Sequence, residues 1–539
     1  MQRNPWFLAV LSALLLVLFW PAALYPLPGA EFVPPLGVLV GFVPLMLLER
    51  SLREQRRGGW KFFGFALLAM ALFNLGTTWW VAGAHWSGVA ATVTINGSLM
   101  AGAWAGYAFA ARRGGERMAF WTLASLWLAL EQLHAHWDVA FPWLDLGHSM
   151  AIVPWAVQWY AFTGPAGGTV WILAINAAVA VAWQNQAEPS RLRRWHLPVL
   201  LLAGPLALSG VLWTQKSDGA RAEPPTTARV AVVQPNLDPY TEKFELPELW
   251  QVSQTLDRLK KDRPANAPAL DWVVFPETFL PSGLEEDRLQ TSAALQPLVD
   301  FSKATGSNLL VGATTYGLVD EPSDASRATG DGRWYETYNS SLWLDSSGVR
   351  GTYHKSKLVV GVERMPFIGY LKPLMGDAAI ALGGTSGTLG TQSKRAVFGD
   401  RPGLLRAAPV ICWEQDFSDY VTDYVRLGAN FLAVQTNDGW WGNTPGHIQH
   451  LHYARLRAVE TGLWVVRSAN TGVSAVIDHR GTVLQRLNWD RAGHLEASVP
   501  DVRHEPTYYS RSGNYLGGMS VWLAPLLLLS VWVKTRTKR

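Results

Sequence analysis

The stretch Ala408-Pro-Val-Ile-Cys-Trp-Glu414 is a short β-rich run that ends on Cys412, the only cysteine of the chain. One cysteine excludes an intramolecular disulfide, so the thiol is either a small buried apolar group or a reactive one. Strand ends in α/β domains are where a rigid scaffold presents reactive side chains. The position of Cys412 at such an end makes it a candidate nucleophile.

Similar β-rich runs recur on both sides of this stretch, and helical segments lie between several of them. The β-rich runs are 229–234, 272–275, 308–313, 341–344, 408–412, 431–435, 464–468 and 473–477. The helical segments are 247–261, 289–305 and 446–462. Alternating strands and helices predict an α/β layered domain. We place it at 229–502, after a linker at 217–228 that is rich in proline, alanine and charged residues.

The first two hundred residues consist mostly of apolar runs of about 20 residues, the length that a helix needs to cross a bilayer. Seven runs begin near Trp6, Phe32, Phe62, Val89, Met118, Ala151 and Leu197, and an eighth covers 515–533. We therefore expect a membrane α-helical bundle of about eight spans, seven of them in 1–216. The first run also resembles a signal peptide, but further spans follow at once and no clear cleavage site precedes them.

Basic residues in the connecting loops predict how these spans are oriented. Arginine and lysine follow the second, fourth, sixth and eighth runs, whereas the loops at 82–86 and 134–148 contain neither. Positively charged loops stay in the cytoplasm, so we expect both termini there and 229–502 on the opposite side. The net charge is only +4 and the basic residues form no single stripe, which argues against a nucleic-acid partner.

Two further strand ends carry groups that complement a cysteine nucleophile. The run 272–276 leads into Glu277, and Lys355 follows a strand and a turn, with Lys357 two residues later. A carboxylate base can activate a thiol, and an ammonium group can stabilise the oxyanion of a tetrahedral intermediate. These residue types together predict acyl transfer through a thioester. Taken alone, Glu277 is better explained as a turn cap, and spacing does not choose between the two lysines.

Several motifs resemble one known family. Pro276-Glu-Thr278, the Lys355 segment and Ile411-Cys-Trp-Glu414 resemble the Glu-Lys-Cys triad of the nitrilase superfamily. Its membrane-embedded branch, the bacterial apolipoprotein N-acyltransferases, is matched by 437–442, 449–450, 454–460, 467–472 and Phe141-Pro-Trp-Leu144. The resemblance implies eight spans around a periplasmic α-β-β-α sandwich domain, in the bacterial inner membrane.

The resemblance also implies a role for each matched residue. Glu277 would be the general base, Cys412 the nucleophile, and Lys355 the group that stabilises the oxyanion. Supporting glutamates of the family match Glu363 and Glu414, although Glu414 is equally compatible with a structural ion pair. Trp413 would line the acyl-chain entrance.

One segment departs from the family. Leu358-Val-Val-Gly-Val-Glu363 lacks the proline and phenylalanine that many relatives have after the lysine. The loop that carries Glu363 is therefore expected to differ in shape, although the glutamate keeps its offset from Lys355.

The reaction implied by the resemblance has two steps. An acyl chain first moves from a phospholipid, typically phosphatidylethanolamine, to the cysteine. The free α-amine of a diacylglyceryl-cysteine on an apolipoprotein then accepts it. A membrane-anchored amide or nitrile hydrolase, and a transporter or scaffold with a degenerate nitrilase-like domain, remain as alternatives.

Neither a metal nor an organic cofactor is implied. Three histidines, His447, His450 and His452, lie close together in the sequence. On a helix their spacing would not put all three on one face, and no cysteine or acidic partner completes a zinc site.

Overall fold

The computed structural model divides the chain into two compact units, which we describe separately. The structure describes residues 4–184, 191–219, 226–264, 266–375, 387–501 and 506–536. The first unit is helical and comprises Met1–Ser217, Thr444–Leu456 and Ser512–Arg539. The second unit contains the β-sheets and comprises Asp218–Asn443 and Arg457–Arg511. The expected boundaries 1–216, 217–228, 229–502 and 515–533 stay predictions.

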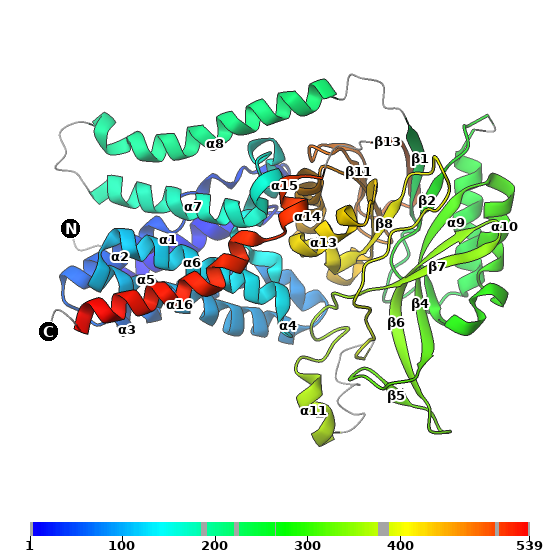
Figure 1. Ribbon diagram of the computed structural model, residues 1–539, viewed down its shortest axis with the longest axis horizontal. Coiled ribbons are helices and arrows are strands. Elements are labelled where there is room, and N and C mark those ends of the chain that lie inside the picture. Colours follow the sequence, from blue (N-terminus) through cyan, green and yellow to red (C-terminus); the bar gives the residue numbers. More distant parts are fainter. Residues whose placement is uncertain are drawn as a thin grey trace. The chain divides into compact units, whose positions relative to one another are not determined.

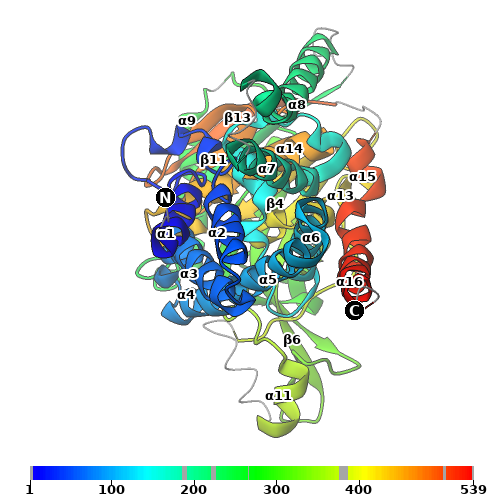
Figure 2. The ribbon, with the colours of Figure 1, turned by 90° about the vertical axis from the view of Figure 1, so that its left-hand side faces the viewer.

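Long helices form most of the described part of the first unit (Figures 1 and 2). They are α1 (Pro5–Leu18), α2 (Val43–Glu54), α3 (Gly59–Thr78), α5 (Gly97–Gly114), α6 (Glu116–His136), α7 (Tyr160–Gln184), α8 (Arg191–Gly219) and α16 (Tyr515–Arg536). A short helix, α4 (Trp86–Ala91), lies between α3 and α5 in the sequence. Helix α6 packs against both α5 and α16, so the C-terminal helix belongs to the bundle.

Four of the described helices are long and apolar enough to cross a membrane: those at Gly59–Gly83, Tyr160–Gln184, Arg193–Lys216 and Tyr515–Lys534. Helix α1 is apolar but only 14 residues long. The expected number of eight spans stays a prediction.

Two helices begin later than the apolar runs from which they were expected. The run from Phe32 opens with short 3-10 turns before α2 starts at Val43, and the run from Ala151 does the same before α7 starts at Tyr160. Prolines occupy the first positions of the turns at Pro35–Gly37 and Pro154–Ala156. Proline lacks a backbone N–H and disfavours a helical residue before it, which delays the regular helix.

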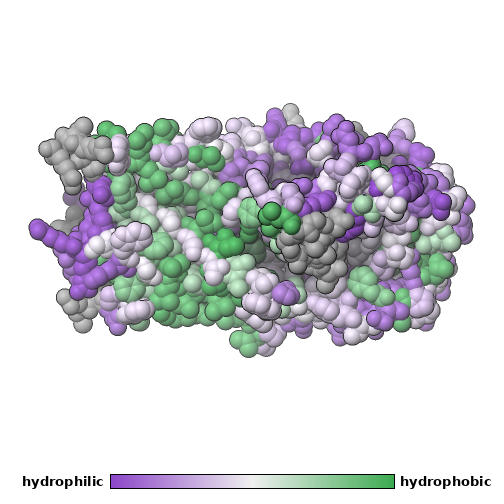
Figure 3. Space-filling model, turned by 90° about the horizontal axis from the view of Figure 1, so that it is seen from below, coloured by the Kyte–Doolittle hydropathy of each residue, from purple (hydrophilic) through white to green (hydrophobic). Residues whose placement is uncertain are grey.

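The outer surface of the helical unit is strongly apolar. On the face seen in Figure 3, hydrophobic side chains cover most of this unit and hydrophilic ones gather at one end. Trp6, Leu200 and Trp522 are each more than 60% exposed. The start of α1 and the end of α16 lie at the same end of the unit (Figure 1). A bundle that is apolar on its outside is typical of a membrane-embedded protein.

The segment Thr444–Leu456, from the first part of helix α14 (Pro445–Thr461), completes a buried aromatic cluster in the helical unit. The indole of Trp143 donates a hydrogen bond to the Gln449 side chain at 2.6 Å, and its ring stacks on His450. The Tyr453 hydroxyl donates to the Trp143 carbonyl at 2.9 Å. Two motifs more than 300 residues apart in the sequence are therefore parts of one packed cluster.

Two β-sheets face each other in the second unit, with helices on their outer faces (Figure 1). The first sheet has the order β13 (Gly493–Pro500), β1 (Thr227–Gln234), β2 (Trp272–Val274), β4 (Asn308–Val319), β6 (Trp334–Asp345) and β5 (Arg327–Ala328). In addition, β3 (Leu280–Glu285) pairs with β4 and β7 (Gly348–His354) pairs with β6. The second sheet has the order β12 (Val483–Leu487), β11 (Ser474–Ile477), β10 (Trp464–Ala469), β9 (Phe431–Thr436) and β8 (Ala407–Ile411).

Helices α9 (Glu248–Asp262) and α10 (Gln296–Thr305) cover the first sheet, and α13 (Ser418–Arg426) packs beside β8. The buried side chains Val252, Leu256 and Leu259 recur at helical spacing along α9 and join one apolar core with β1, β2 and β4. Burying each such side chain contributes about 1.5–3 kcal/mol to folding. The expected α-β-β-α sandwich is confirmed, and it gives the sheet edges a rigid support.

Strand direction brings the candidate residues to one edge of the first sheet. β2 and β4 are parallel, β6 is antiparallel to β4, and β7 is antiparallel to β6. β7 therefore runs in the same direction as β2. The residues that follow β2 and β7, which include Glu277 and Lys355, leave the sheet at the same edge.

Candidate active site

Glu277 lies in a tight turn directly after β2. The next residue, Thr278, has φ +46°, a backbone conformation that is unfavourable for a β-branched residue. The turn also lies against Gly312 of β4, where an added Cβ would come within 2.2 Å of the Pro276 carbonyl oxygen. Strained backbone of this kind is often found at functional sites. Gly312 allows the close approach that places Glu277.

Lys355 is the residue after β7, and its ammonium group is held between two glutamates. Its Nζ lies 2.9 Å from Oε1 of Glu277 and 2.9 Å from Oε2 of Glu363. The side chain of Lys355 is only 1% exposed. Buried charges are tolerated only when they are paired and hydrogen-bonded, and this arrangement provides both. The prediction that Lys355 and Glu277 act together therefore has a geometric basis.

Asn339 of β6 connects the two glutamates. Its Nδ2 donates to Glu277 Oε1 at 2.8 Å and to Glu363 Oε1 at 2.9 Å, and its carbonyl accepts the Lys355 backbone N–H at 2.8 Å. The second oxygen of Glu277 accepts the Asn437 backbone N–H at 3.1 Å. Both oxygens of Glu277 are therefore fixed by protein donors.

Cys412 follows β8 and begins a short 3-10 turn, Cys412–Asp416. It is 6% exposed and has φ +48°, so it shares the left-handed backbone conformation of Thr278. Its thiol lies within electrostatic range of Glu277 and Lys355. The structure thus brings all three residues of the expected triad together within the second unit.

Burial and neighbouring charges together raise the pKa values of Cys412 and Lys355 and lower that of Glu277. Burial, followed by the negative charge of Glu277, raises the pKa of Cys412 well above its usual range, although Lys355 opposes this. Burial alone would raise the pKa of Glu277, but the Lys355 charge and the hydrogen bonds from Lys355 and Asn339 bring it below the ordinary value. Burial also disfavours the ammonium form of Lys355, yet Glu277 and Glu363 outweigh it and raise the pKa. The resting site therefore holds a neutral thiol next to an ionised carboxylate.

Glu363 joins the site despite the altered loop sequence before it. Its Oε2 accepts the Val359 backbone N–H at 2.9 Å, so the glutamate itself closes the loop. Neither the proline nor the phenylalanine of many relatives is needed for this contact.

Glu414 lies behind the site, where it is fully buried. Its carboxylate accepts hydrogen bonds from the backbone N–H groups of Ser356 and Ile411, both at 2.8 Å, and from the hydroxyls of Tyr353 and Tyr420. These bonds tie the turn after Lys355 to the turn that carries Cys412. Burial raises the pKa of Glu414, although the four hydrogen bonds oppose the shift.

Trp413 is 5% exposed and packs edge-on against Phe417, with the two ring centroids 6.0 Å apart. Its expected place at the entrance for an acyl chain stays a prediction.

Sequence reasoning missed two polar residues of this site, Asn339 and Lys243. Asn339 lies in β6, two residues before the β-rich run 341–344, where an amide carries no distinctive signal. Lys243 lies in a turn whose other residues are mostly exposed. Its Nζ donates to the Glu277 carbonyl at 2.9 Å and to the Thr278 hydroxyl at 2.7 Å.

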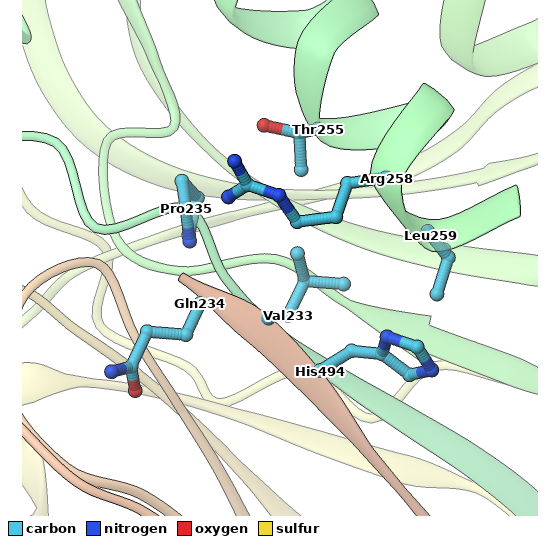
Figure 4. A pocket seen from close by; sticks show the side chains of 8 residues that line it. Val233, Gln234, Pro235, Thr255, Arg258, Leu259 and His494 are labelled. Carbon is cyan, nitrogen blue, oxygen red and sulfur yellow. The ribbon is translucent and has the colours of Figure 1, made fainter. Parts of the chain in front are cut away.

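A small pocket lies elsewhere in the second unit, between β1, α9 and β13 (Figure 4). Arg258, His494, Gln234 and Thr255 line it together with apolar residues, and its volume is about 10 Å³. That volume is enough for about one water molecule. Within the described ranges, no group of three or more histidine, cysteine, aspartate or glutamate residues is arranged to hold a metal ion.

Comparison with known proteins identifies two matching family models. Residues 12–178 match the apolipoprotein N-acyltransferase N-terminal domain, and residues 229–507 match the carbon-nitrogen hydrolase family. An apolipoprotein N-acyltransferase from Chlorobaculum tepidum is 30% identical, over 99% of this chain and 97% of its own length. The enzyme of the same name from Allorhizobium ampelinum is 29% identical, over 90% of this chain and 87% of its own.

Among solved structures, an amidase from Nesterenkonia sp. matches with 17% sequence identity and a TM-score of 0.36. The match covers 55% of this chain and 96% of the amidase. It is too loose to support any inference about activity.

Proposed function

Because the chain belongs to the apolipoprotein N-acyltransferase family, we propose that it transfers a fatty acyl chain from a phospholipid to a lipoprotein through a thioester on Cys412. The acceptor is the N-terminal α-amine of a diacylglyceryl-cysteine. The observation that carries the proposal is the bonded set of Glu277, Lys355 and Glu363 with the thiol of Cys412 in electrostatic range.

In the first step, Glu277 takes the proton of the Cys412 thiol. The thiolate attacks the ester carbonyl carbon of the phospholipid, and Lys355 stabilises the negative charge that develops on the carbonyl oxygen. The C–O bond then breaks, and the departing alkoxide of the lysophospholipid takes the proton from Glu277. The thiol of Cys412 has become a thioester and the carboxylate of Glu277 is ionised again.

In the second step, the α-amine of the acceptor attacks the thioester carbonyl carbon. Glu277 removes a proton from the attacking nitrogen, the C–S bond breaks, and the released thiolate takes that proton from Glu277. The lowered pKa of Glu277 keeps the carboxylate ionised before each step, as a general base requires. Asn339 and the Asn437 backbone N–H hold its two oxygens in place throughout.

We further propose that the helical unit spans the bacterial inner membrane with both termini in the cytoplasm and the site on the periplasmic side. Two observations support this orientation: the alternation of basic loops along the sequence, and the position of the start of α1 and the end of α16 at one end of the helical unit. Phosphatidylethanolamine is the proposed acyl donor.

The proposal is tested with purified enzyme in detergent micelles and phosphatidylethanolamine that carries a labelled acyl chain. Wild type should accumulate a label that hydroxylamine releases, and Cys412→Ala should accumulate none. Adding a diacylated lipopeptide should discharge the label as a triacylated product. Label on Cys412→Ala would disprove the role of the cysteine, and free fatty acid as the main product would indicate a hydrolase.

A further inference from the structure

Lys243 is a buried lysine beside the site, and the two-step mechanism above gives it no role. It lies in the turn between β1 and α9. From Tyr240 to Trp250 the side chains are exposed or half-buried, except for that of Lys243, which is 1% exposed. Lysine is almost never fully buried unless it is paired. A single lysine that points inward from an exposed turn therefore requires an explanation.

The turn holds the backbone of Lys243 in place from both sides. Its backbone N–H donates to the Asp238 carbonyl at 2.9 Å. Its own carbonyl accepts from the Gln251 side chain at 2.9 Å, and the same amide donates to Leu246 at 2.8 Å. Helix α9 and the turn thus hold the backbone at Lys243, from which the side chain extends inward.

The ammonium group of Lys243 binds the strained turn that carries the proposed base. It donates to the carbonyl of Glu277 at 2.9 Å and to the hydroxyl of Thr278 at 2.7 Å. Thr278 is the residue with φ +46°. Among the described residues, no carboxylate forms an ion pair with the ammonium group of Lys243. Its hydrogen-bond partners are instead a backbone carbonyl and a hydroxyl.

A count of charges gives Lys243 a second role. Glu277 and Glu363 carry two negative charges, which Lys355 and the protonated form of Lys243 balance. Asp438, whose charge also acts on Cys412, is balanced by Arg467. When the thiol of Cys412 passes its proton to Glu277, one negative charge moves and the sum stays zero. Without Lys243, the thiolate would form in a buried site that already has an excess of negative charge, and burial strongly disfavours such a charge.

The pKa of Lys243 agrees with this position. Burial lowers it to about 7, while the charges of Glu277 and Cys412 favour the ammonium form. These two groups are the titratable groups that act on it.

We propose that Lys243 is a positioning residue for acyl transfer, which fixes the turn of Glu277 and balances the charge beside Cys412. The inference rests on the proposed function, because it assumes that Glu277 is the base and Cys412 the nucleophile.

The test compares Lys243→Met, Lys243→Arg and Lys261→Met. Lys261 is an exposed lysine of α9, so its substitution serves as the matched control. Single-turnover formation of the thioester is measured with labelled phospholipid. Alkylation of Cys412 by iodoacetamide at pH 6 reports the thiolate, since the chain has no other cysteine.

Lys243→Met should slow both reactions at least about tenfold, the equivalent of one pKa unit or more, with the KM for phospholipid changed less than about threefold. Lys243→Arg should recover most of the loss, and Lys261→Met should match wild type. Wild-type rates for Lys243→Met would overturn the proposal. A second result would also overturn it: slower thioester formation and a lower melting temperature, with the alkylation rate of Cys412 unchanged. That result would indicate a purely structural role for Lys243.

A second pair of variants decides the matter if Lys243→Met does not fold. Thr278→Val removes the hydroxyl acceptor with little change in shape, and Thr278→Ser keeps it. The valine variant should be slower than the serine variant in both assays, and equal rates would overturn the proposal. Cys412→Ala in the same assay separates a failure of the proposed function from a failure of this inference. Label on Cys412→Ala refutes the proposed function itself. An unlabelled Cys412→Ala together with a fully active Lys243→Met refutes only the role of Lys243.

Discussion

One buried polar arrangement of the helical unit and one of the sheet unit are built in different ways. In the helical unit, buried side chains such as Asn176 and Glu131 bind backbone groups: Asn176 accepts from Phe42 and donates to Val38, and Glu131 accepts from Leu146. In the sheet unit, the buried charges of Lys355, Glu277 and Glu363 bind one another. The first kind of contact fastens irregular segments to helices. The second concentrates ionisable groups where a proton can move between them.

This difference predicts that substitutions in the sheet site change the rate of reaction, whereas those in the helical unit change stability. The largest effect is expected for Glu277→Gln. The amide cannot accept the proton of Cys412, so thioester formation should fall about 10³-fold or more. Detergent extraction and gel filtration should show a normally inserted and folded protein. Near-normal thioester formation in this variant would rule out Glu277 as the base.

A matched pair of glycine substitutions compares the two units directly. In Gly312→Ala the added Cβ would meet the backbone of Pro276–Thr278, with the nearest atom at 2.2 Å, and so displace Glu277. A misplacement of about 1 Å should cost about 10²-fold in the rate of thioester formation. Gly64→Ala in α3 meets no atom within 4 Å and should be as active as wild type. Equal activity of the two variants would show that the turn of Glu277 tolerates a shift.

The pH dependence of thioester formation should follow the two charges that flank the thiol. The pKa of Glu277 lies below its ordinary value of 4.5, so the base should lose its charge, and the rate should fall, only below about pH 4.5. Lys243 should lose its proton as the pH rises through about 7, and the rate should decline above that value. A stopped-flow or quenched single-turnover series over pH 4–9 measures both limbs. Lys243→Arg should lack the alkaline decline, because arginine stays charged.

The smallest effect on the rate is expected in the helical unit. Asn176→Leu leaves the Phe42 N–H and the Val38 carbonyl without their side-chain partner in a buried place. The free energy of unfolding should fall by about 1–3 kcal/mol, seen as a lower melting temperature in detergent. Thioester formation per folded enzyme should stay within about twofold of wild type. A rate loss as large as that of Gly312→Ala would erase the distinction between the two units.

The triad was predictable because each member follows a strand and lies in a recognisable motif. Glu277 and Lys355 leave the first sheet at the same edge, whereas Cys412 follows β8 of the second sheet, so the three residues meet only because the two sheets pack face to face. Eight predicted β-rich runs coincide with strands, although β8 ends at Ile411, one residue before the cysteine. The short or exposed strands, such as β5 and β12, were missed because they contain few buried residues.

The parts that sequence did not predict depend on contacts between distant segments. The burial of Lys243 arises from the turn that α9 organises, which no local pattern indicates. The loop that carries Glu363 was expected to differ in shape because it lacks two family residues, yet the hydrogen bond from the Val359 backbone N–H to the glutamate closes it. The late starts of α2 and α7 reflect proline at the preceding turns.

The solitary state of Cys412 has a consequence for how the protein matures. An exposed pair of cysteines in an oxidising compartment can be lost to a disulfide, but this chain has no second thiol with which to form one. In the folded protein Cys412 is only 6% exposed, so thiols of other proteins have little access to it. Cys412 is therefore protected from pairing with a second cysteine of the chain by its isolation in the sequence, and from thiols of other proteins by its burial in the fold.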